Sequence, residues 1–252
     1  MGSTSVRNII LGVSLVLTSA CNTIFVVHDA DTEVEGNTDG SFCDNVPDDV
    51  IICDDFEDEQ GVADTQNGQV SWVDDPVFEG TQAMCAQTSA EESWACMAYP
   101  FTAVESGTIY FSARFFIPDD TVTGNITLVN LSGQVDEASE QTFGVDINVS
   151  ALRSMDIYVH GNFTRYASDD DRVPTGRWFC LVGTYSISDV SGEASVWIDD
   201  NLVVSTTASE EAVVTGGVSE LHVGIGWTED GQETAVVYVD NLKMGTSPIT
   251  CD

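Results

Sequence analysis

Polar and ionisable side chains recur at every second position in two neighbouring segments, 142–149 and 155–160, where they alternate with apolar residues. Successive side chains of a β-strand point to opposite faces, so each polar set lies on one face of its strand. A short connection joins the two segments, and we therefore expect the strands to pair and to share one polar surface. The expected members of this surface are Asp146, Asn148, Asp156, Tyr158 and His160.

An array of carboxylates, an amide, a phenol and an imidazole suits two kinds of chemistry. Sugar hydroxyls need polar partners and apolar sugar faces need rings, so the array suits a glycan-binding groove. The same surface suits β-elimination, with Tyr158 and His160 as general base and acid and Arg114 neutralising a uronate carboxylate. A solvated outer face of a sandwich also alternates polar with apolar residues, and this third interpretation stays open.

Arg114 depends on the placement of its own strand, 108–117. In that strand Ile109, Phe111, Ala113, Phe115 and Ile117 share one face, and Arg114 lies on the other. Arg114 joins the polar surface only if its strand lies in the same sheet. Arg165 and Trp227 lie near strand ends, where they could line the rim. Trp227, however, shares its parity with Leu221, Val223 and Ile225, which predicts a core position.

The stretch "SVWIDDNLVVS", residues 195–205, places two aspartates and an asparagine between two apolar runs. Paired carboxylates can do acid–base work, but Asp and Asn also tolerate left-handed backbone and form hydrogen bonds with their own main chain. Apolar residues alternate before Asp199 and resume at Leu202. This pattern predicts a hairpin turn rather than a catalytic pair.

From residue 50 onward the chain consists of short runs rich in Val, Ile, Phe, Tyr and Thr, separated by Gly, Asp, Asn and Pro. These runs predict strands, and no segment predicts a helix. A dozen or so strands in one domain indicate an all-β, two-sheet antiparallel jelly-roll sandwich. The expected strands are 50–56, 70–73, 83–87, 93–99, 108–117, 126–131, 142–149, 155–160, 177–187, 194–198, 202–205, 218–226 and 235–244.

The charge balance limits the partners. The chain has 42 acidic residues against 7 basic ones, a formal net charge of −35. Phosphate contacts need Lys and Arg, so nucleic acid is excluded as a partner. The same charge disfavours anionic polymers, unless metal ions or a local arginine cluster intervene.

The N-terminus predicts export. Arg7 precedes an apolar run, 9–17, that is too short to span a bilayer. The sequence "LTSAC" that follows resembles the lipobox of bacterial lipoproteins, which implies a signal peptide over 1–20 and lipidation of Cys21. Residues 18–20 also suit ordinary signal cleavage and secretion. We expect an acidic tether over 21–41, a folded domain over 42–252, and an outer-membrane or cell-surface location with membrane contact through the lipid alone.

Lipidation of one cysteine leaves an even set, which in an exported chain predicts disulfides. Cys85 and Cys96 flank a segment whose pattern predicts a hairpin, and Cys43 lies close to Cys53 in sequence. This leaves Cys180 and Cys251 to pair with each other. Six cysteines allow about fifteen pairings, so spacing alone does not decide among them. The candidates are Cys43, Cys53, Cys85, Cys96, Cys180 and Cys251.

Four stretches resemble concanavalin A-like lectin/glucanase and laminin-G-like domains. They are "ICDDFED" (52–58), "TIYFSARFFIP" (108–118), "VPTGRWFCLVGTYSISDVSGEASVWIDDNLVV" (173–204) and "VVYVDNLKM" (236–244). The likeness covers most of residues 50–252 and implies a jelly roll of two curved sheets that binds ligands on its concave face or rim. The Glu-x-Asp-x-x-Glu strand of the family's hydrolases and the Arg-x-Glu-x-Arg strand of its alginate lyases are absent from the sequence.

The resemblance also implies that the first and last strands lie side by side, so that Asp55 or Glu57 would meet Asp240. Closely packed carboxylates favour a cation, and Ca²⁺ takes six to eight oxygen ligands. We therefore expect a structural calcium ion, with hydrogen-bonded acids at the strand ends as the alternative.

Taken together, these features predict an exported, lipid-anchored carbohydrate-binding module without catalytic activity, whose partner is a polysaccharide or glycan. A lyase that uses the same groove and an envelope component without a sugar site are the two alternatives.

Overall fold

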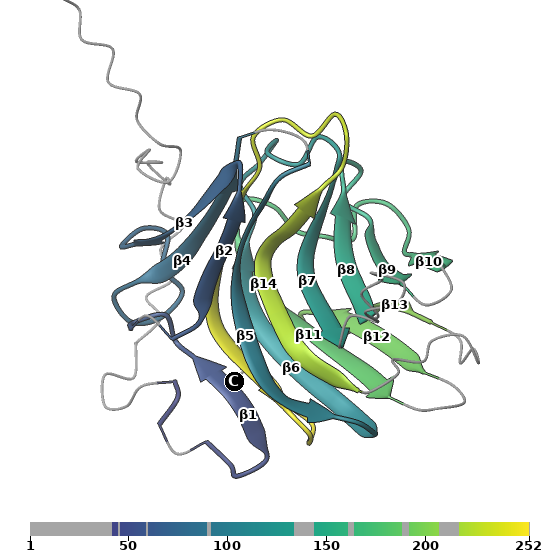
Figure 1. The fold of residues 1–252 in the computed structure, drawn as a ribbon. Helices are drawn as coiled ribbons and strands as arrows, with labels where there is room; N and C mark the ends of the chain where they lie inside the picture. Colours follow the sequence, from purple (N-terminus) through teal and green to yellow (C-terminus); the bar gives the residue numbers. More distant parts are fainter. Residues whose placement is uncertain are drawn as a thin grey trace, which may run out of the picture.

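The computed structural model describes residues 42–44, 46–58, 60–89, 92–133, 144–160, 164–187, 192–206 and 217–251. These residues form fifteen strands and no helix (Figure 1). The strands are β1 (Val50–Asp54), β2 (Val62–Gln66), β3 (Gly68–Val73), β4 (Ala83–Thr88), β5 (Trp94–Val104), β6 (Gly107–Phe116), β7 (Asn125–Gly133), β8 (Gly144–Ser150), β9 (Met155–Val159), β10 (Thr164–Ala167), β11 (Trp178–Ile187), β12 (Glu193–Ile198), β13 (Asn201–Ser205), β14 (Val218–Thr228) and β15 (Val236–Gly245).

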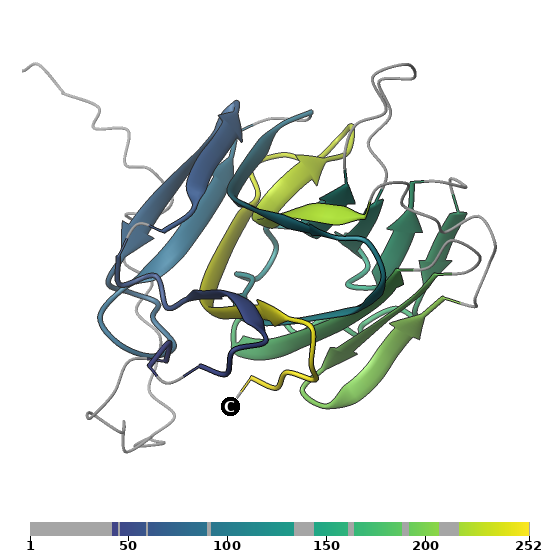
Figure 2. The same ribbon diagram turned by 60° about the horizontal axis from the view of Figure 1, so that its bottom comes forward.

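The described strands make two antiparallel sheets. The eight-stranded sheet has the order β13-β12-β11-β6-β15-β4-β3, with β1 added alongside β15. The seven-stranded sheet has the order β10-β9-β8-β7-β14-β5-β2. Figure 1 shows β5, β14 and β7 crossing in front of β6 and β11, and Figure 2 shows the two layers from below. The predicted all-β, two-sheet antiparallel sandwich is confirmed.

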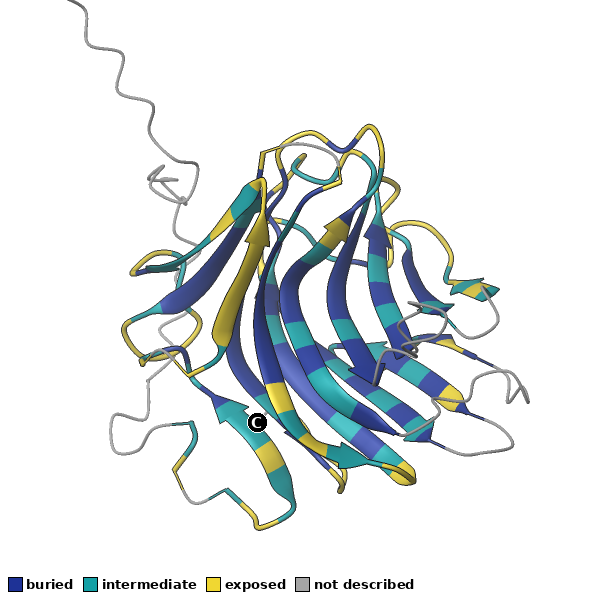
Figure 3. Ribbon diagram, in the orientation of Figure 1, coloured by how far each residue is buried: buried dark blue, intermediate teal, exposed yellow. Residues whose placement is uncertain are grey.

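The core lies between the sheets and follows the alternation of each strand. Val145, Ile147 and Val149 of β8 are at most 3% exposed, while the polar residues between them face outward. On β6, the residues from Ile109 to Ile117 that share odd positions are likewise buried. On β8 and β11 the residues between the core positions stay partly exposed, as the banding in Figure 3 shows.

Two strands, β2 and β10, have no counterpart in the sequence prediction. They are the two edges of the seven-stranded sheet. All five residues of β2 are exposed (Figure 3), and β10 has only four residues. Neither strand carries an apolar pattern long enough to predict it, because an edge strand is held largely by its backbone pairing, with β5 for β2 and with β9 for β10.

The Asp199–Asp200 stretch is a hairpin turn, as predicted. Both residues adopt left-handed backbone, with φ of 47° and 63°, between β12 and β13. Asp199 accepts hydrogen bonds from the backbone of Cys180 and from Arg177, at 2.9 Å each. Positive φ at both central residues is the geometry of the tight hairpin that matches strand twist.

The disulfide prediction is confirmed for two pairs and wrong for the third. Cys43–Cys53 and Cys180–Cys251 are bonded, with Cα separations of 5.7 and 6.0 Å. Cys96 is a buried free thiol, so the predicted Cys85–Cys96 pair is not formed. Cys85 is on β4 and Cys96 on β5, which belong to opposite sheets. Their side chains alternate with core residues on both strands and so point away from each other.

The predicted signal peptide, tether and lipidation site at Cys21 lie outside the described residues. In the part of the chain that is described, no helix is long and apolar enough to cross a membrane.

We expect Gly183→Ala to destabilise the fold. A Cβ at Gly183 would lie 2.0 Å from the Phe111 ring directly opposite it on β6. Forcing a methyl group into a filled core costs about 1–3 kcal/mol. Urea denaturation measures this loss, and Phe111→Leu supplies the test of its cause. If the same Gly183→Ala change costs as much in the Phe111→Leu background, the ring contact is not the reason.

Candidate functional site

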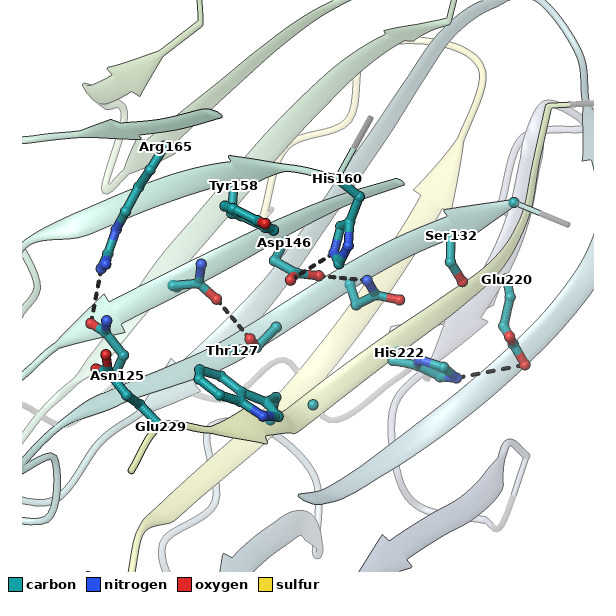
Figure 4. Close-up of a pocket in the computed structure, with 15 residues that line it drawn as sticks. Asn125, Thr127, Ser132, Asp146, Tyr158, His160, Arg165, Glu220, His222 and Glu229 are labelled. Carbon is teal, nitrogen blue, oxygen red and sulfur yellow. Dashed lines mark hydrogen bonds and ion pairs between the residues drawn. The ribbon is translucent and has the colours of Figure 1, made fainter. Parts of the chain in front are cut away.

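A groove of about 670 Å³ lies on the outer face of the seven-stranded sheet, the face away from the core (Figure 4). We call it the outer groove. Strands β7, β8, β9, β10 and β14 supply nearly all of its walls. It is lined by Asn125, Thr127, Asn130, Ser132, Gly133, Asp146, Asn148, Tyr158, His160, Arg165, Glu220, His222, Gly226, Trp227 and Glu229.

Cross-strand register brings the polar side chains into rows. One row runs through four adjacent strands, as His222 pairs with Asn130, Asn130 with Asp146 and Asp146 with Tyr158. Directly opposite residues on neighbouring strands have adjacent side chains on the same face. The predicted pairing of the two central strands is therefore confirmed, and four of the predicted residues line the outer groove: Asp146, Asn148, Tyr158 and His160.

Trp227 is not in the core, contrary to the parity argument. Its side chain is 45% exposed and lines the outer groove. Between Val223 and Trp227 the chain advances four residues along β14 while β7 advances two. This bulge includes Gly224, whose φ of 126° suits glycine. A bulge shifts the side-chain phase of the residues after it, so Trp227 faces out while Ile225 faces in.

His160 is held by Asp146 at the centre of the groove. Its Nε2 lies 2.8 Å from Asp146 Oδ2, and Asn130 donates its amide to the other oxygen of Asp146. The Tyr158 ring stands edge-on to the imidazole, with centroids 5.1 Å apart. Burial lowers the pKa of His160, but the hydrogen bond and charge of Asp146 outweigh it, so the net pKa is raised.

Asp156 differs from the prediction, because it lies beneath the groove rather than on its surface. Its side chain is fully buried. Asn148 donates to one carboxylate oxygen at 2.9 Å, and the Arg165 guanidinium donates to the other. Arg165 also donates to Asn125 Oδ1 at 3.0 Å, and Thr127 donates to Asn148 Oδ1 at 2.7 Å. Asp156 thus positions the groove's polar side chains and has no free face for a ligand.

Arg114 is not part of the outer groove. Its strand, β6, belongs to the eight-stranded sheet, and Arg114 lies on the outer face of that sheet. There its guanidinium sits 4.2 Å from the Phe78 ring centroid and donates to the Cys251 carbonyl at 3.1 Å. Arg114 was expected to join the polar surface only if its strand lay in the same sheet, and it does not. Tyr158 and His160 therefore lack the arginine that the elimination hypothesis assigned to them.

The carboxylates predicted to hold calcium lie on or just after two paired strands. Asp55 and Glu57 follow β1, and Asp240 is on β15. Asp240 is fully buried and accepts hydrogen bonds from the backbone of Phe78, Glu79 and Asn241. Glu57 accepts from Thr81 and Gln82, whereas Asp55 is half-buried beside them. Within the described residues, no group of three or more His, Cys, Asp or Glu has the geometry of a metal site. A calcium ion here stays a prediction.

Several groove residues were not identified from the sequence. Five of them come from β7, the fifth being Gly133, and the strand shows a phase slip: Asn125 and Thr127 face out, as do Asn130 and Ser132, with Leu128 and Val129 both buried between them. That adjacent apolar pair is a visible signal of a bulge. The others, Glu220, His222, Gly226 and Glu229, come from β14 and its end. They reach the groove only because β14 inserts beside β7.

Figure 4 shows how the labelled side chains are distributed. Arg165, Asn125 and Glu229 gather at one end of the groove, and Glu220, His222 and Ser132 lie toward the other. His160, Asp146 and Tyr158 lie between the two ends. The groove therefore offers hydrogen-bond donors and acceptors along its length, an exposed indole and one imidazole–carboxylate pair.

We expect Asp146→Asn to lower the pKa of His160 below that of a free imidazole. The substitution removes the charge that raises this pKa, whereas the burial that lowers it remains. NMR titration of the His160 ring measures the change, and Glu220→Gln is the control that should leave the His160 pKa where it is. An unchanged pKa in Asp146→Asn would show that the ion pair does not set it.

We expect Asp240→Asn to weaken the dependence of stability on pH. Burial raises the pKa of Asp240 to about 7. Three backbone hydrogen bonds lower this pKa, and the negative charge of Glu57 raises it further. The folded chain therefore binds more protons than the unfolded chain between about pH 4 and pH 7, and its unfolding free energy falls as the pH rises through that window. In Asp240→Asn, the decrease in unfolding free energy across this window should be smaller by about 2–4 kcal/mol.

Urea unfolding in the presence of a chelator, at about pH 5 and about pH 8, measures this difference. Asp230→Asn, at an exposed position, is the control. Equal pH dependence in the wild-type chain and Asp240→Asn would contradict the prediction. Calcium added at the higher pH tests the metal prediction, because an ion bound by Asp240 should stabilise the wild-type chain and not the variant.

Comparisons with known proteins support the fold. No protein-family model and no curated protein sequence matches the chain. Among solved structures, "Cellulose induced protein, Cip1" has a TM-score of 0.59 at 15% identity, over 80% of this chain and 100% of the other. Alginate lyase vAL-1 from Chlorella virus has a TM-score of 0.53 at 12% identity, over 73% and 91%.

A structure of botulinum neurotoxin type C, whose cell entry depends on interaction with two ganglioside molecules, has a TM-score of 0.55 at 12% identity. It covers 81% of this chain and 49% of that one. All three are jelly-roll sandwiches, so the fold of this chain is a jelly roll consistent with the concanavalin A-like class.

Proposed function

We propose that the outer groove binds a polysaccharide without cleaving it. The observation that carries this proposal is Trp227, a large apolar ring that is 45% exposed at a groove otherwise lined by polar groups. Burial of such a ring is the ordinary outcome in a folded domain, so its exposure beside polar side chains marks a surface suited to a ligand.

The surrounding chemistry matches the two faces of a sugar ring. The apolar C–H face of a pyranose packs on an indole, whereas its hydroxyls need donors and acceptors in fixed positions. Thr127, Asn130 and Asn148 have their side chains tied to one another or to carboxylates, which holds them in place before a ligand arrives. Preorganised polar groups lower the entropic cost of binding.

The structural neighbours support the same class of ligand. Their titles name a protein induced by cellulose, a lyase of alginate and a toxin that interacts with gangliosides. At 12–15% identity these proteins share a fold with this chain, and we use them only to favour a carbohydrate over other ligands.

Cleavage by β-elimination is the second candidate, favoured by the contact between Tyr158 and His160. The reaction needs a cation that neutralises the uronate carboxylate while the base removes the neighbouring proton. Arg114 lies on the other sheet, and Arg165 is bound to the buried Asp156. Binding alone is therefore the better supported function. Unsaturated products from a uronate polymer would establish the lyase instead.

We further propose that the chain is exported and held at a bacterial outer membrane or cell surface by lipid on Cys21. The proposal rests on the N-terminal sequence, with its short apolar run and its lipobox-like "LTSAC". Mass spectrometry of the mature protein would identify an acylated Cys21, and a free N-terminus elsewhere would contradict this proposal.

We expect Trp227→Ala to weaken polysaccharide binding about tenfold or more, because the stacking surface is lost. Native gel electrophoresis in gels cast with single polysaccharides measures this as reduced retardation. Leu202→Ala is the matched control, since Leu202 is 50% exposed on β13 of the other sheet and its loss should leave retardation unchanged.

The thermal unfolding midpoint of both variants must stay at the wild-type value for the comparison to hold. Retardation that survives in Trp227→Ala would place the sugar site elsewhere. No retardation of the wild-type chain by any polymer would favour an envelope component without a sugar site.

A further inference from the structure

The outer groove carries more carboxylates than cations. Asp146, Glu220 and Glu229 line it, and Asp156 lies directly beneath. Against these four stand one guanidinium, Arg165, and the imidazoles of His160 and His222. The local charge is negative even when both imidazoles hold a proton.

Each of these cations already faces a carboxylate. His160 lies 2.8 Å from Asp146, and His222 lies 3.6 Å from Glu220. Arg165 pairs with Asp156, whose side chain is fully buried. Moving Arg165 onto a ligand carboxylate would leave Asp156 charged and buried without its counter-ion, and breaking such a pair is strongly unfavourable.

Among the described residues, no other basic side chain lines the groove. The remaining basic residues of the described chain are absent from its lining. They are Arg114, Arg153, Arg172, Arg177 and Lys243. The segments outside the described residues contain one more, Arg7, in the predicted signal peptide.

We infer that the outer groove selects neutral polysaccharides and rejects polymers of uronic acids. Asp146, Glu220 and Glu229 would repel a uronate carboxylate that entered the groove. Each cationic side chain that lines the groove already faces a carboxylate of the protein. A neutral sugar makes the same hydroxyl contacts without that repulsion. The inference rests on the proposed function, since it names the class of glycan that the groove takes.

Matched polymers isolate the effect of charge. Soluble cellulose derivatives, mannan and galactan are each cast in native gels beside the same polymer after oxidation of its C6 hydroxyls to carboxylates. We expect at least one neutral polymer to retard the chain, and its oxidised form to bind about tenfold more weakly at low salt. Salt should narrow the gap, because it screens the repulsion. Gels are run with calcium and with chelator.

Charge variants test the cause. Glu220→Gln combined with Glu229→Gln should strengthen binding of the oxidised polymer more than binding of the neutral one, so that the ratio of the two affinities falls below the wild-type ratio. Equal or tighter binding of the oxidised form by the wild-type chain, in calcium or in chelator, overturns the inference while leaving polysaccharide binding in place. Retardation by neither form of any polymer overturns the proposed function itself, and with it this inference.

Discussion

The alternation of side chains along a β-strand is the constraint on which the rest of this structure depends. Two sheets bury one face each against a shared core, so every second residue of every central strand is committed to packing. Function is left with the outward set. On the seven-stranded sheet that set is polar and ionisable over four neighbouring strands, and cross-strand register turns isolated polar residues into rows.

Two bulges place side chains in the groove that strict alternation would point into the core. Without the slip in β14, Trp227 would follow Ile225 into the core and the groove would have no exposed indole. A second slip, in β7, lies between Thr127 and Val129 and keeps both Thr127 and Asn130 on the outer face. Bulges commonly re-aim side chains next to binding sites, and here two of them meet on adjacent strands.

A buried carboxylate organises one half of the groove. Asp156 takes hydrogen bonds from Asn148 and Arg165, and these two in turn contact Thr127 and Asn125. A charge in a low-dielectric site is tolerated only when it is paired and fully hydrogen-bonded, so the four partners are held in one arrangement. The same pairing withdraws the groove's arginine from ligands. In a chain with a net charge of −35, the one guanidinium that lines the groove is thus paired with a buried carboxylate.

The sequence alone determined the features that depend on local pattern: the all-β class, the buried and outward faces of β6 and β8, the Asp199–Asp200 turn, and the acidity that disfavours anionic partners. Period-two alternation and the left-handed tolerance of aspartate are properties of a few consecutive residues. Only the tertiary structure decided which sheet each strand joins, and this separated Arg114 from the groove and Cys85 from Cys96. It also brought His222 and Trp227 beside β7. Strand partners are chosen by backbone hydrogen bonds and core packing between segments as far apart in the sequence as Val50 and Gly245, and such contacts leave no local signature.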